Sequence, residues 1–484
     1  MIKRRIRLYS YHTFLVIPFV VLFLYGHNLS QSSLSMTYRT LLIGAVISVA
    51  LFMMFYFLMK KNRLKAGVFT TLLLFGLFQY GVFYEMLEWL YYQGSWPFSN
   101  IHRYLIIFYL LVLGAGFVFI RRSKHDFIKI NYFLNVLIGI LLFFNIYNIF
   151  TGQSKAPDEK SQLNAERTGI TFADSAARPD IYYIILDGYA SAAVLEKFYH
   201  FSNRDFVSAI RQRGFEFSDS AFANYYYTSH SLASSLNMDY HTDLDNINQK
   251  LRDNKVFRIF KENGYQIHHL YSGYAVTGSF TDADSTVNIS GPNEFEKSML
   301  RHTILRLDDL IGIFAHQRLS SQFRQMYKMA SVSGVPKFSF MHFVAPHPPY
   351  IFDREGKIRT GHRFTEHSWE PAELYVDQLI HVNNQVLSLT DTILKKNPRA
   401  CIILQSDHGP WVSATSADEV FEARSRILYA LRAPGVKPPQ RTSSVNTFRH
   451  LISSLYQCSL PLLNDSAAGK TALYRDPILT KKIN

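Results

Sequence analysis

Carboxylate and imidazole side chains follow three short apolar runs of this sequence. Asp187 follows IYYIIL, His347 comes shortly after KFSFMHFV, and Asp407 and His408 follow CIILQS. One strand that ends in a polar turn is ordinary. Three ends that carry such side chains point to shared chemistry, because rigidly held Asp and His are suitable ligands for a divalent cation. Asp187, Asp407 and His408 are therefore the candidate metal ligands.

A candidate nucleophile lies in ANYYYTSHSLASSLNM, residues 223–238. The run after Thr228 predicts a short helix, which places Thr228 at the helix N-terminus. Free backbone amides and the helix dipole stabilise negative charge there, so a Thr228 alkoxide beside a cation would be stabilised twice. The alternative is that Thr228 only caps the helix.

Strands and helices alternate after Pro179. The expected strands are residues 181–186, 266–271, 337–344, 401–404 and 426–431, with helical patterns between them, for example at 202–214 and 375–396. This alternation predicts a mostly parallel sheet covered by helices. Ligands of open α/β sheets bind beyond the carboxyl ends of the strands, where the candidate residues fall.

The first 150 residues predict a transmembrane domain. Each of five apolar runs has 17–19 residues without Asp, Glu, Lys or Arg, namely Leu8–Gly26, Leu41–Met59, Ala66–Tyr84, Tyr104–Ile120 and Tyr132–Phe150. A helix of this length crosses the hydrocarbon core. The first run has a basic start, as a signal peptide does, but no small-residue cleavage site follows it. We therefore interpret it as a retained helix.

Positive charge predicts the orientation of these helices. Residues 1–7, 60–65 and 121–129 each contain four Lys or Arg, whereas the other two links contain few. Lys and Arg mark the cytoplasmic side, so the N-terminus is expected inside and the chain after Phe150 outside. The net charge of +14 is then mostly a topology signal, and it does not indicate a nucleic-acid partner.

Residues 151–178 are polar and lack an apolar period. They are expected to link the transmembrane domain at 1–150 to an exported domain at 179–484. Both cysteines, Cys401 and Cys458, lie in the exported part, where a disulfide is permitted. Because Cys401 falls in an expected central strand, a buried free thiol is favoured there.

The outer link at residues 85–103 is rich in aromatic side chains, which are Trp89, Tyr91, Tyr92, Trp96 and Phe98. An aromatic belt at the membrane interface explains this composition. The alternative is that the link helps to seat a lipid donor beneath the exported domain.

The order of the motifs resembles the alkaline-phosphatase superfamily. Asp-Gly follows the first strand, a Thr opens a helix 41 residues later, and a His-Pro turn and an Asp-His-Gly end follow. The segment around Thr228 is similar to the sulfatase pattern C-x-P-x-R-x-S-L-x-T-G, and LDGY looks like the corresponding turn of nucleotide pyrophosphatase/phosphodiesterases. With five helices before the exported domain, the architecture resembles lipoteichoic acid synthases and phosphoethanolamine transferases. The resemblance implies an alkaline-phosphatase-like α/β/α sandwich on the outer side of a bacterial cytoplasmic (inner) membrane.

The resemblance also implies roles for the candidate residues. Thr228 falls at the nucleophile position, and Asp187, Thr228, Asp407 and His408 fall at the ligands of the main metal. His347 falls near the histidine that binds the transferred phosphate group or protonates the leaving group. Zn²⁺ suits this mixture of ligands, and Mn²⁺ or Mg²⁺ suits an oxygen-rich site.

Two departures from the sulfatase pattern narrow the chemistry. Thr228, His230 and Leu232 stand where sulfatases have Cys or Ser, Pro and Arg, which excludes formylglycine chemistry and argues against a sulfatase. The first strand supplies one Asp instead of a pair, so one metal is expected. Four other imidazoles are expected in surface or packing positions and are the candidates for a second site: His241, His342, His362 and His367.

The implied reaction is transfer of a phosphoethanolamine- or phosphoglycerol-type group from a phospholipid donor to a glycan or lipid of the cell envelope. Thr228 attacks the phosphodiester, a phospho-threonine forms, and the acceptor resolves it. Two alternatives stay open. One is a membrane-anchored phosphodiesterase or phosphatase that uses water, and the other is a non-catalytic envelope assembly protein on the same fold.

The orientation can be tested with a reporter enzyme that is active only outside the cytoplasm. Fused after Asn484, the reporter is expected to be active, because the positive links place the chain after Phe150 outside. Inserted between Lys60 and Lys65, it is expected to be silent. Reporter activity is measured together with expression, and a well-expressed but silent fusion after Asn484 would overturn the orientation.

Overall fold

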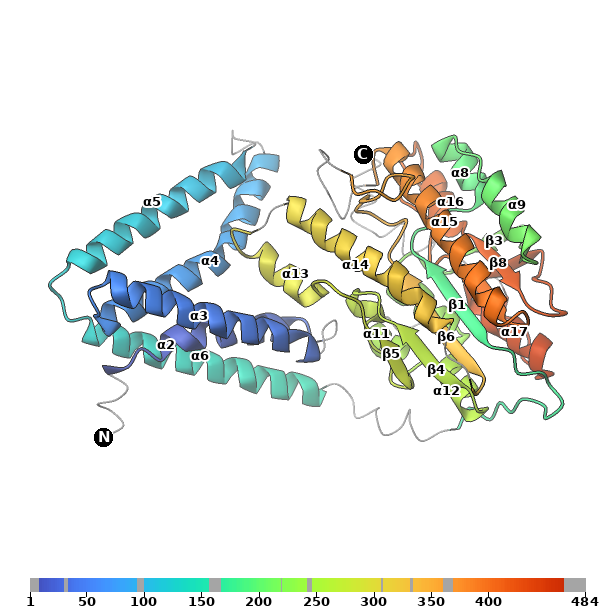
Figure 1. The fold of residues 1–484 in the computed structure, drawn as a ribbon, viewed down its shortest axis with the longest axis horizontal. Coiled ribbons are helices and arrows are strands. Elements are labelled where there is room, and N and C mark those ends of the chain that lie inside the picture. The colour runs from blue at the N-terminus through green and yellow to red at the C-terminus, as the bar shows by residue number, and fades with distance from the viewer. Residues whose placement is uncertain are drawn as a thin grey trace. The chain divides into compact units, whose positions relative to one another are not determined.

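The computed structural model describes residues 8–29, 34–93, 100–155, 167–218, 220–241, 246–305, 308–330, 334–359 and 369–464. The chain divides into two compact units. The first contains residues 1–161 and 292–310, and the second contains residues 162–291 and 311–484. The first unit is helical and the second has an α/β fold (Figure 1).

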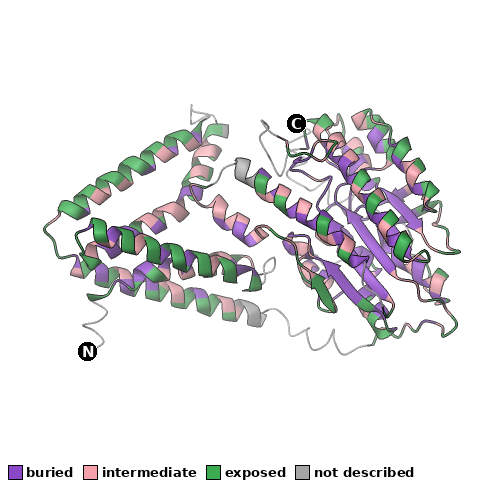
Figure 2. Ribbon diagram, in the orientation of Figure 1, coloured by how far each residue is buried: buried purple, intermediate pink, exposed green. Residues whose placement is uncertain are grey.

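The first unit consists of apolar helices and one short amphipathic helix. In chain order its elements are α2 (His12–His27), η1 (Leu34–Thr37), α3 (Tyr38–Leu58), α4 (Arg63–Tyr92), α5 (Ile101–Arg122), α6 (Ile128–Lys155) and α13 (Glu294–Arg301). Among the described residues, α3 with η1, α4, α5 and α6 are long and apolar enough to cross a membrane, whereas α2 is shorter, with 16 residues. The five expected apolar helices are thus present, but the first falls below the length of a full span. Figure 2 shows that α3, α5 and α6 expose much of their surface, which is apolar.

Polar side chains are buried inside this unit between α2, α4 and α6. The Nδ1 atom of His12 lies 2.6 Å from Thr71 Oγ1, and its Nε2 atom lies 3.0 Å from Asn131 Oδ1. The Asn135 side chain accepts a hydrogen bond from the His12 N–H (2.8 Å) and donates one to the Tyr9 carbonyl (2.7 Å). Because these groups satisfy one another, they join three helices without exposing polar atoms to hydrocarbon.

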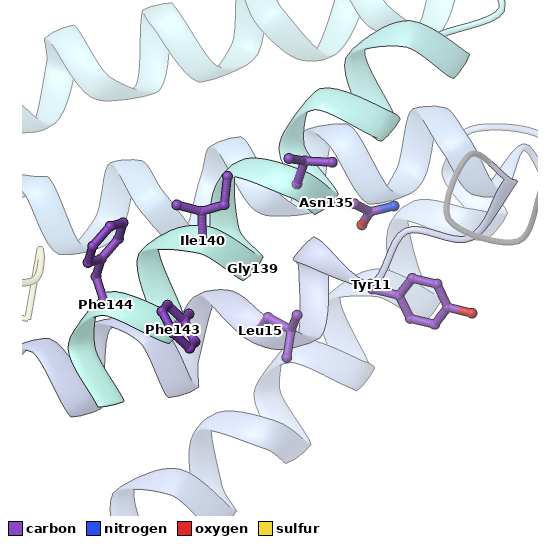
Figure 3. A pocket seen from close by; sticks show the side chains of 8 residues that line it. Tyr11, Leu15, Asn135, Gly139, Ile140, Phe143 and Phe144 are labelled. Atoms are coloured by element: carbon purple, nitrogen blue, oxygen red, sulfur yellow. The ribbon is translucent and has the colours of Figure 1, made fainter. Parts of the chain in front are cut away.

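An apolar groove of about 610 Å³ lies between α2 and α6 (Figure 3). Leu15, Ile140 and Phe143 contribute to its walls. A Cβ added at Gly139, which also lines the groove, would have no neighbouring atom within 4 Å. The one amide in the lining, Asn135, is already hydrogen-bonded within the protein, so the groove presents a mostly apolar surface.

The helix α13 belongs to the first unit although it comes from far along the chain. Its Phe295 packs into the same apolar cluster as α2, and its Glu296 forms an ion pair with Arg39. Just after this helix, the His302 carbonyl accepts a hydrogen bond from the Gly81 N–H at 3.0 Å. The sequence assigned this segment to the exported domain. The structure groups it with the apolar helices, because the partners of its apolar face lie there.

The aromatic link at 85–103 is helical over much of its length. The helix α4 continues through Tyr92, and Trp89 and Tyr91 are exposed on it. Trp96 and Phe98 lie outside the described residues. The expected loop is therefore shorter than the sequence indicated, because no proline or glycine lies between Gly81 and Gln93 to end the helix.

The second unit is built on a seven-stranded sheet with the strand order β2-β8-β7-β1-β6-β4-β5. Its strands are β1 (Ile181–Leu186), β2 (Glu216–Phe217), β4 (Gln266–Leu270), β5 (Ser285–Val287), β6 (Lys337–Phe343), β7 (Cys401–Gln405) and β8 (Tyr429–Arg432), and β3 (Ser220–Phe222) pairs with β9 (Arg441–Ser443) in a small second sheet. The four pairings from β7 to β5 are parallel. At the other edge, β8 pairs antiparallel with β7, and β2 pairs antiparallel with β8. All five expected strands are present, so the mostly parallel sheet is confirmed.

Helices cover both faces of this sheet (Figure 1). They are α8 (Ala192–Tyr199), α9 (Arg204–Gln212), α10 (Thr228–Asn237), α11 (Ile247–Arg252), α12 (Lys255–Glu262), α14 (Asp308–Met329), α15 (Ala372–Lys396), α16 (Ala417–Ser425) and α17 (Thr447–Tyr456), with 3-10 turns η2 (Ala275–Thr277) and η3 (Ser444–Asn446). Side chains alternate across a strand. Tyr182 and Ile184 of β1 therefore pack in the core under α8, α9, α14 and α15, and Tyr183 and Ile185 pack in the core over α10, α11, α12 and α17.

Part of the expected linker belongs to the second unit. The helix α6 extends to Lys155, and residues 156–166 lie outside the described part of the chain. After this, Phe172 is buried and stacks on Tyr456 with 3.7 Å between the ring centroids. Both cysteines have free thiols, and Cys401 is buried in β7, in agreement with the expectation from the sequence.

Candidate active site

The site lies at the carboxyl ends of three neighbouring parallel strands, β7, β1 and β6. Asp187 directly follows β1, His342 is the last residue but one of β6, and Asp407 comes two residues after β7. The strand order places these three ends side by side. One ligand atom from each of the three buried side chains lies within 4.8 Å of the other two.

His408 closes the cluster on a second side. Its Nε2 atom lies 3.3 Å from Asp407 Oδ2 and 3.6 Å from Asp187 Oδ1. Its Nδ1 atom lies 3.0 Å from the Gly409 carbonyl. A carbonyl only accepts hydrogen bonds, so the ring proton sits on Nδ1 and the Nε2 lone pair faces the carboxylates.

Thr228 reaches the same cluster from the start of α10. It is the first helical residue, after Tyr227 at the N-cap, so Thr228 is not the cap itself. Its Oγ1 atom lies 3.3 Å from His408 Nε2, and the hydroxyl lies beside the Asp407 carboxylate. One helical turn later, Ser231 donates a hydrogen bond to the Asp407 carbonyl at 2.6 Å. Positions three apart share a helix face, so Ser231 fixes the face that carries Thr228.

A buried arginine connects the two loops that carry His408 and Thr228. Arg424 of α16 donates one hydrogen bond to the Gly409 carbonyl at 2.6 Å and another to the Tyr226 carbonyl. Its guanidinium also lies 4.7 Å from the centre of the Trp411 ring. The planar fork of arginine holds two acceptors in one fixed geometry, so Arg424 sets the spacing between the loops.

His347 lies beside the cluster and not within it. Its N–H donates to the Asp187 carbonyl at 3.0 Å, and its Nδ1 atom lies 2.7 Å from the Pro348 carbonyl. Its ring is 6.4 Å from that of His408 and 4.8 Å from that of Trp369, measured between centroids. Unlike the other site residues, His347 is only partly buried.

Gly188 allows the chain to turn away directly after Asp187. It has φ +72°, and an added Cβ would lie 2.5 Å from the Trp369 ring. Its N–H donates to Asp407 Oδ1 at 3.2 Å, and the N–H of His408 donates to the same oxygen at 2.9 Å. Glycine at this position therefore allows both the left-handed turn and the close approach of the tryptophan.

The two carboxyl groups differ in their electrostatics. Burial opposes ionisation of Asp187, but the nearby imidazoles of His347, His342 and His408 together bring its pKa below its usual value. Burial and the adjacent charge of Asp187 raise the pKa of Asp407 to about 6. Burial and the charge of Arg424 hold the pKa of His408 well below 6.5, so its imidazole is neutral. Burial lowers the pKa of Arg424 only to about 10, which leaves it charged at neutral pH.

The described residues of the cluster fit a divalent cation. Asp187 Oδ1, Asp407 Oδ2 and His342 Nε2 are buried polar atoms without a hydrogen-bond partner within the described protein. Atoms left unsatisfied in this way are costly, and these three face one another within a few ångströms. Two carboxylates with imidazole nitrogens form a donor set that Zn²⁺ accepts.

Sequence reasoning located four of these residues and overlooked others. Asp187, Thr228, Asp407 and His408 come together, and His347 stands next to them. His342 was counted among the spare imidazoles, yet it lies inside the cluster. The available signal was its position at the carboxyl end of the strand that leads to His347. The other imidazoles lie elsewhere or outside the described residues: His241 packs on Tyr225, and His362 and His367 are not described.

Comparison with known proteins identifies the family of the second unit. A sequence model of the sulfatase family matches residues 179–459, which is more than half of the chain. The chain belongs to the sulfatase family, and its second unit is a sulfatase-like enzyme domain. No curated protein matches the chain by sequence.

Solved structures similar to the chain include transferases of bacterial membranes. The periplasmic domain of EcEptC from Escherichia coli has 14% identity and a TM-score of 0.43, covering 62% of this chain and 90% of that one. The periplasmic domain of phosphoethanolamine transferase EptC from Campylobacter jejuni has 12% identity and a TM-score of 0.42, covering 60% and 94%. The integral membrane protein lipooligosaccharide phosphoethanolamine transferase A from Neisseria meningitidis has 12% identity and a TM-score of 0.41, covering 78% of both chains. The family assignment rests on the sequence match.

Replacement of Arg424 by Lys is expected to destabilise the protein by about 1.5–3 kcal/mol. An ammonium group cannot hold two carbonyls with a fixed fork, and hydrogen bonds to buried charged groups are worth about this much. The chemical denaturation midpoint measures the change. Arg426→Lys, on an exposed neighbour, is the control and is expected to stay within about 0.5 kcal/mol of the unmodified protein. Equal midpoints for the two variants would show that Arg424 does not hold the loops.

Proposed function

We propose that this protein transfers a phospho-substituent from a phospholipid donor to an acceptor of the cell envelope through a covalent intermediate on Thr228. One observation carries the proposal. The Thr228 hydroxyl opens a helix and lies within hydrogen-bond reach of His408 and Asp407, in a cluster that fits a cation. A hydroxyl in this position is a nucleophile with its activating groups in place. The phosphoethanolamine or phosphoglycerol type of the group follows the resemblance of the sequence to such transferases.

Asp187, Asp407, His408 and Thr228 would hold the cation, with His342 as an additional nitrogen ligand. A bound divalent cation stabilises charge on a phosphoryl oxygen and on the attacking oxygen. The N-terminus of α10 adds free amides and the positive end of its dipole at the same place. Zn²⁺ is the metal that best suits two carboxylates and two imidazoles, with Mn²⁺ or Mg²⁺ as the oxygen-preferring alternatives.

The reaction has two steps of the same kind. In the first, the Thr228 hydroxyl gives its proton to solvent and its oxygen bonds to phosphorus, while the bond from phosphorus to the lipid alcohol breaks. The departing alcohol takes a proton, which the partly exposed imidazole of His347 is placed to supply. In the second, the acceptor hydroxyl loses its proton to the same imidazole and bonds to phosphorus, and the Thr228 oxygen leaves and takes a proton back from solvent.

Intact-protein mass spectrometry after incubation with a total lipid extract tests the covalent intermediate. We expect a mass increase equal to one phospho-substituent, which peptide mapping places on Thr228. Thr228→Ala, matched in preparation, is expected to show no increase. If the adduct is absent, or is found on another residue, the proposed nucleophile is wrong. Release of the phosphorylated headgroup without any added acceptor would identify water as the second substrate and favour the phosphodiesterase alternative.

His347→Ala is expected to lower turnover by about 10²–10⁴-fold, the usual contribution of a general acid or base. Metal content is expected to stay nearly unchanged, because His347 lies beside the cluster. Turnover of a phospholipid substrate and metal content by elemental analysis are measured on the same sample. Unaltered turnover would remove His347 from the proposed chemistry.

Asp407→Ala is expected to abolish metal binding and activity together. This carboxylate contacts Thr228, His408 and the Gly188 amide, so its loss opens the centre of the cluster. A chelator is expected to inactivate the unmodified protein, with recovery on addition of Zn²⁺ or Mn²⁺. Full activity after complete removal of divalent metal would contradict the metal-dependent mechanism.

A further inference from the structure

A short turn after β4 approaches the site from the side of His342. Residues 271–278 follow the strand, and the 3-10 turn η2 ends in Thr277. Ser272 and Thr277 are both completely buried, as is His342. Neither hydroxyl belongs to the candidate ligand set, and no motif of the sequence points to them.

Three side chains form a continuous hydrogen-bonded chain that ends on the metal-facing imidazole. The Thr277 hydroxyl lies 2.8 Å from His342 Nδ1, and the Ser272 hydroxyl lies 2.8 Å from that of Thr277. Ser272 in turn donates to the Tyr274 carbonyl at 3.3 Å and accepts from the Tyr274 N–H at 3.0 Å. The other nitrogen of His342, Nε2, lies 3.3 Å from Asp187 Oδ2.

The hydrogen bond from Ser272 to the Tyr274 carbonyl gives the chain one consistent direction. A carbonyl accepts only, so with the Ser272 proton on Tyr274 the Ser272 oxygen accepts from Thr277. The Thr277 oxygen is then left to accept from the Nδ1–H of His342. This arrangement places the ring proton on Nδ1 and leaves the Nε2 lone pair directed at Asp187 and Asp407.

We propose that Thr277, supported by Ser272, is a positioning residue that holds His342 in the tautomer and orientation needed to bind a divalent cation. The inference rests on the proposed metal-dependent function and deepens it. A histidine that ligates a metal donates its other ring N–H to a fixed acceptor, and loss of such an acceptor weakens metal binding by about 10–100-fold. The opposite tautomer would point a proton at the carboxylates and block the site.

The backbone around His342 is fixed independently of Thr277. Gln322 of α14 donates to the His342 carbonyl at 2.6 Å, and the strand pairs with β1 on one side and β4 on the other. Replacement of Thr277 therefore changes the partner of the ring and leaves the strand held. This separation makes the role of the hydroxyl measurable.

Calorimetric titration of the purified, metal-stripped full-length protein with Zn²⁺ tests the proposal. Thr277→Val keeps the shape of the side chain but removes the acceptor, and we expect its Kd to rise by about 10–100-fold. Thr277→Ser restores the hydroxyl and is expected to bind like the unmodified protein. Ser272→Ala keeps the acceptor but removes the group that orients it, and its Kd is expected to fall between the other two.

Thr390→Val is the matched control. Thr390 is completely buried like Thr277, and its hydroxyl has no hydrogen-bond partner among the described residues, so this variant is expected to bind Zn²⁺ normally. Circular dichroism confirms the fold of each variant, and if Thr277→Val does not fold, Ser272→Ala decides the question in the same titration.

The outcomes separate the two proposals. Equal Kd values for Thr277→Val and the unmodified protein, or for Ser272→Ala where that variant decides, would overturn the role of Thr277. Weak Zn²⁺ binding by Thr277→Ser as well would show that the hydroxyl does not determine metal affinity. This result would also overturn the proposed role of Thr277. Failure of the unmodified protein to bind any of Zn²⁺, Mn²⁺ and Mg²⁺ would overturn the metal-dependent function itself, and this inference with it.

Discussion

Two buried carboxyl groups with oxygen atoms within 4.8 Å of each other, Asp187 and Asp407, are the constraint on which the rest of the site depends. Like charges this close repel strongly out of water. Three kinds of neighbouring group offset this repulsion. They are the backbone N–H groups that donate to Asp407, the imidazoles on both sides, and the charged Arg424 behind the loop. Buried acceptors that still lack a partner remain after these contacts. A divalent cation would satisfy them together.

The parallel sheet itself brings the ligand side chains of the site together. The central strand β1 has parallel neighbours on both sides, so the ends of β7, β1 and β6 meet at one edge. Both faces of the strands are filled by apolar cores, which fixes the register because a slip by one residue would exchange the two faces. The strand-borne side chains of the cluster lie at or near these strand ends, and Thr228 is brought to that edge by a separate helix.

The sequence predicted the parts of the site that local patterns determine. A strand that runs into Asp-Gly or Asp-His-Gly, and a threonine that opens a helix, are visible without knowledge of any partner. His342 was missed because it lies within an apolar strand, where a histidine is read as a packing residue. Arg424, Thr277 and the packing of α13 with the apolar helices were missed for a related reason. Their roles depend on contacts with residues far away in the sequence, for example Glu296 with Arg39, and no local period reports such contacts.

The distribution of exposure around the site has a consequence for the order of the reaction. The four residues at the centre of the site are buried, namely Asp187, Thr228, Asp407 and His408. Tyr227 is exposed, and His230 and His347 are partly exposed. In the proposed reaction, donor and acceptor must both reach phosphorus from the side that these residues leave open. A direct exchange would need both alcohols at opposite faces of phosphorus at once, as an in-line displacement requires. A covalent intermediate removes this requirement, because the first alcohol departs before the second occupies the same place. Because Thr228 is on the buried side and both substrates would enter from the exposed side, this geometry favours two sequential steps on Thr228 over a one-step transfer.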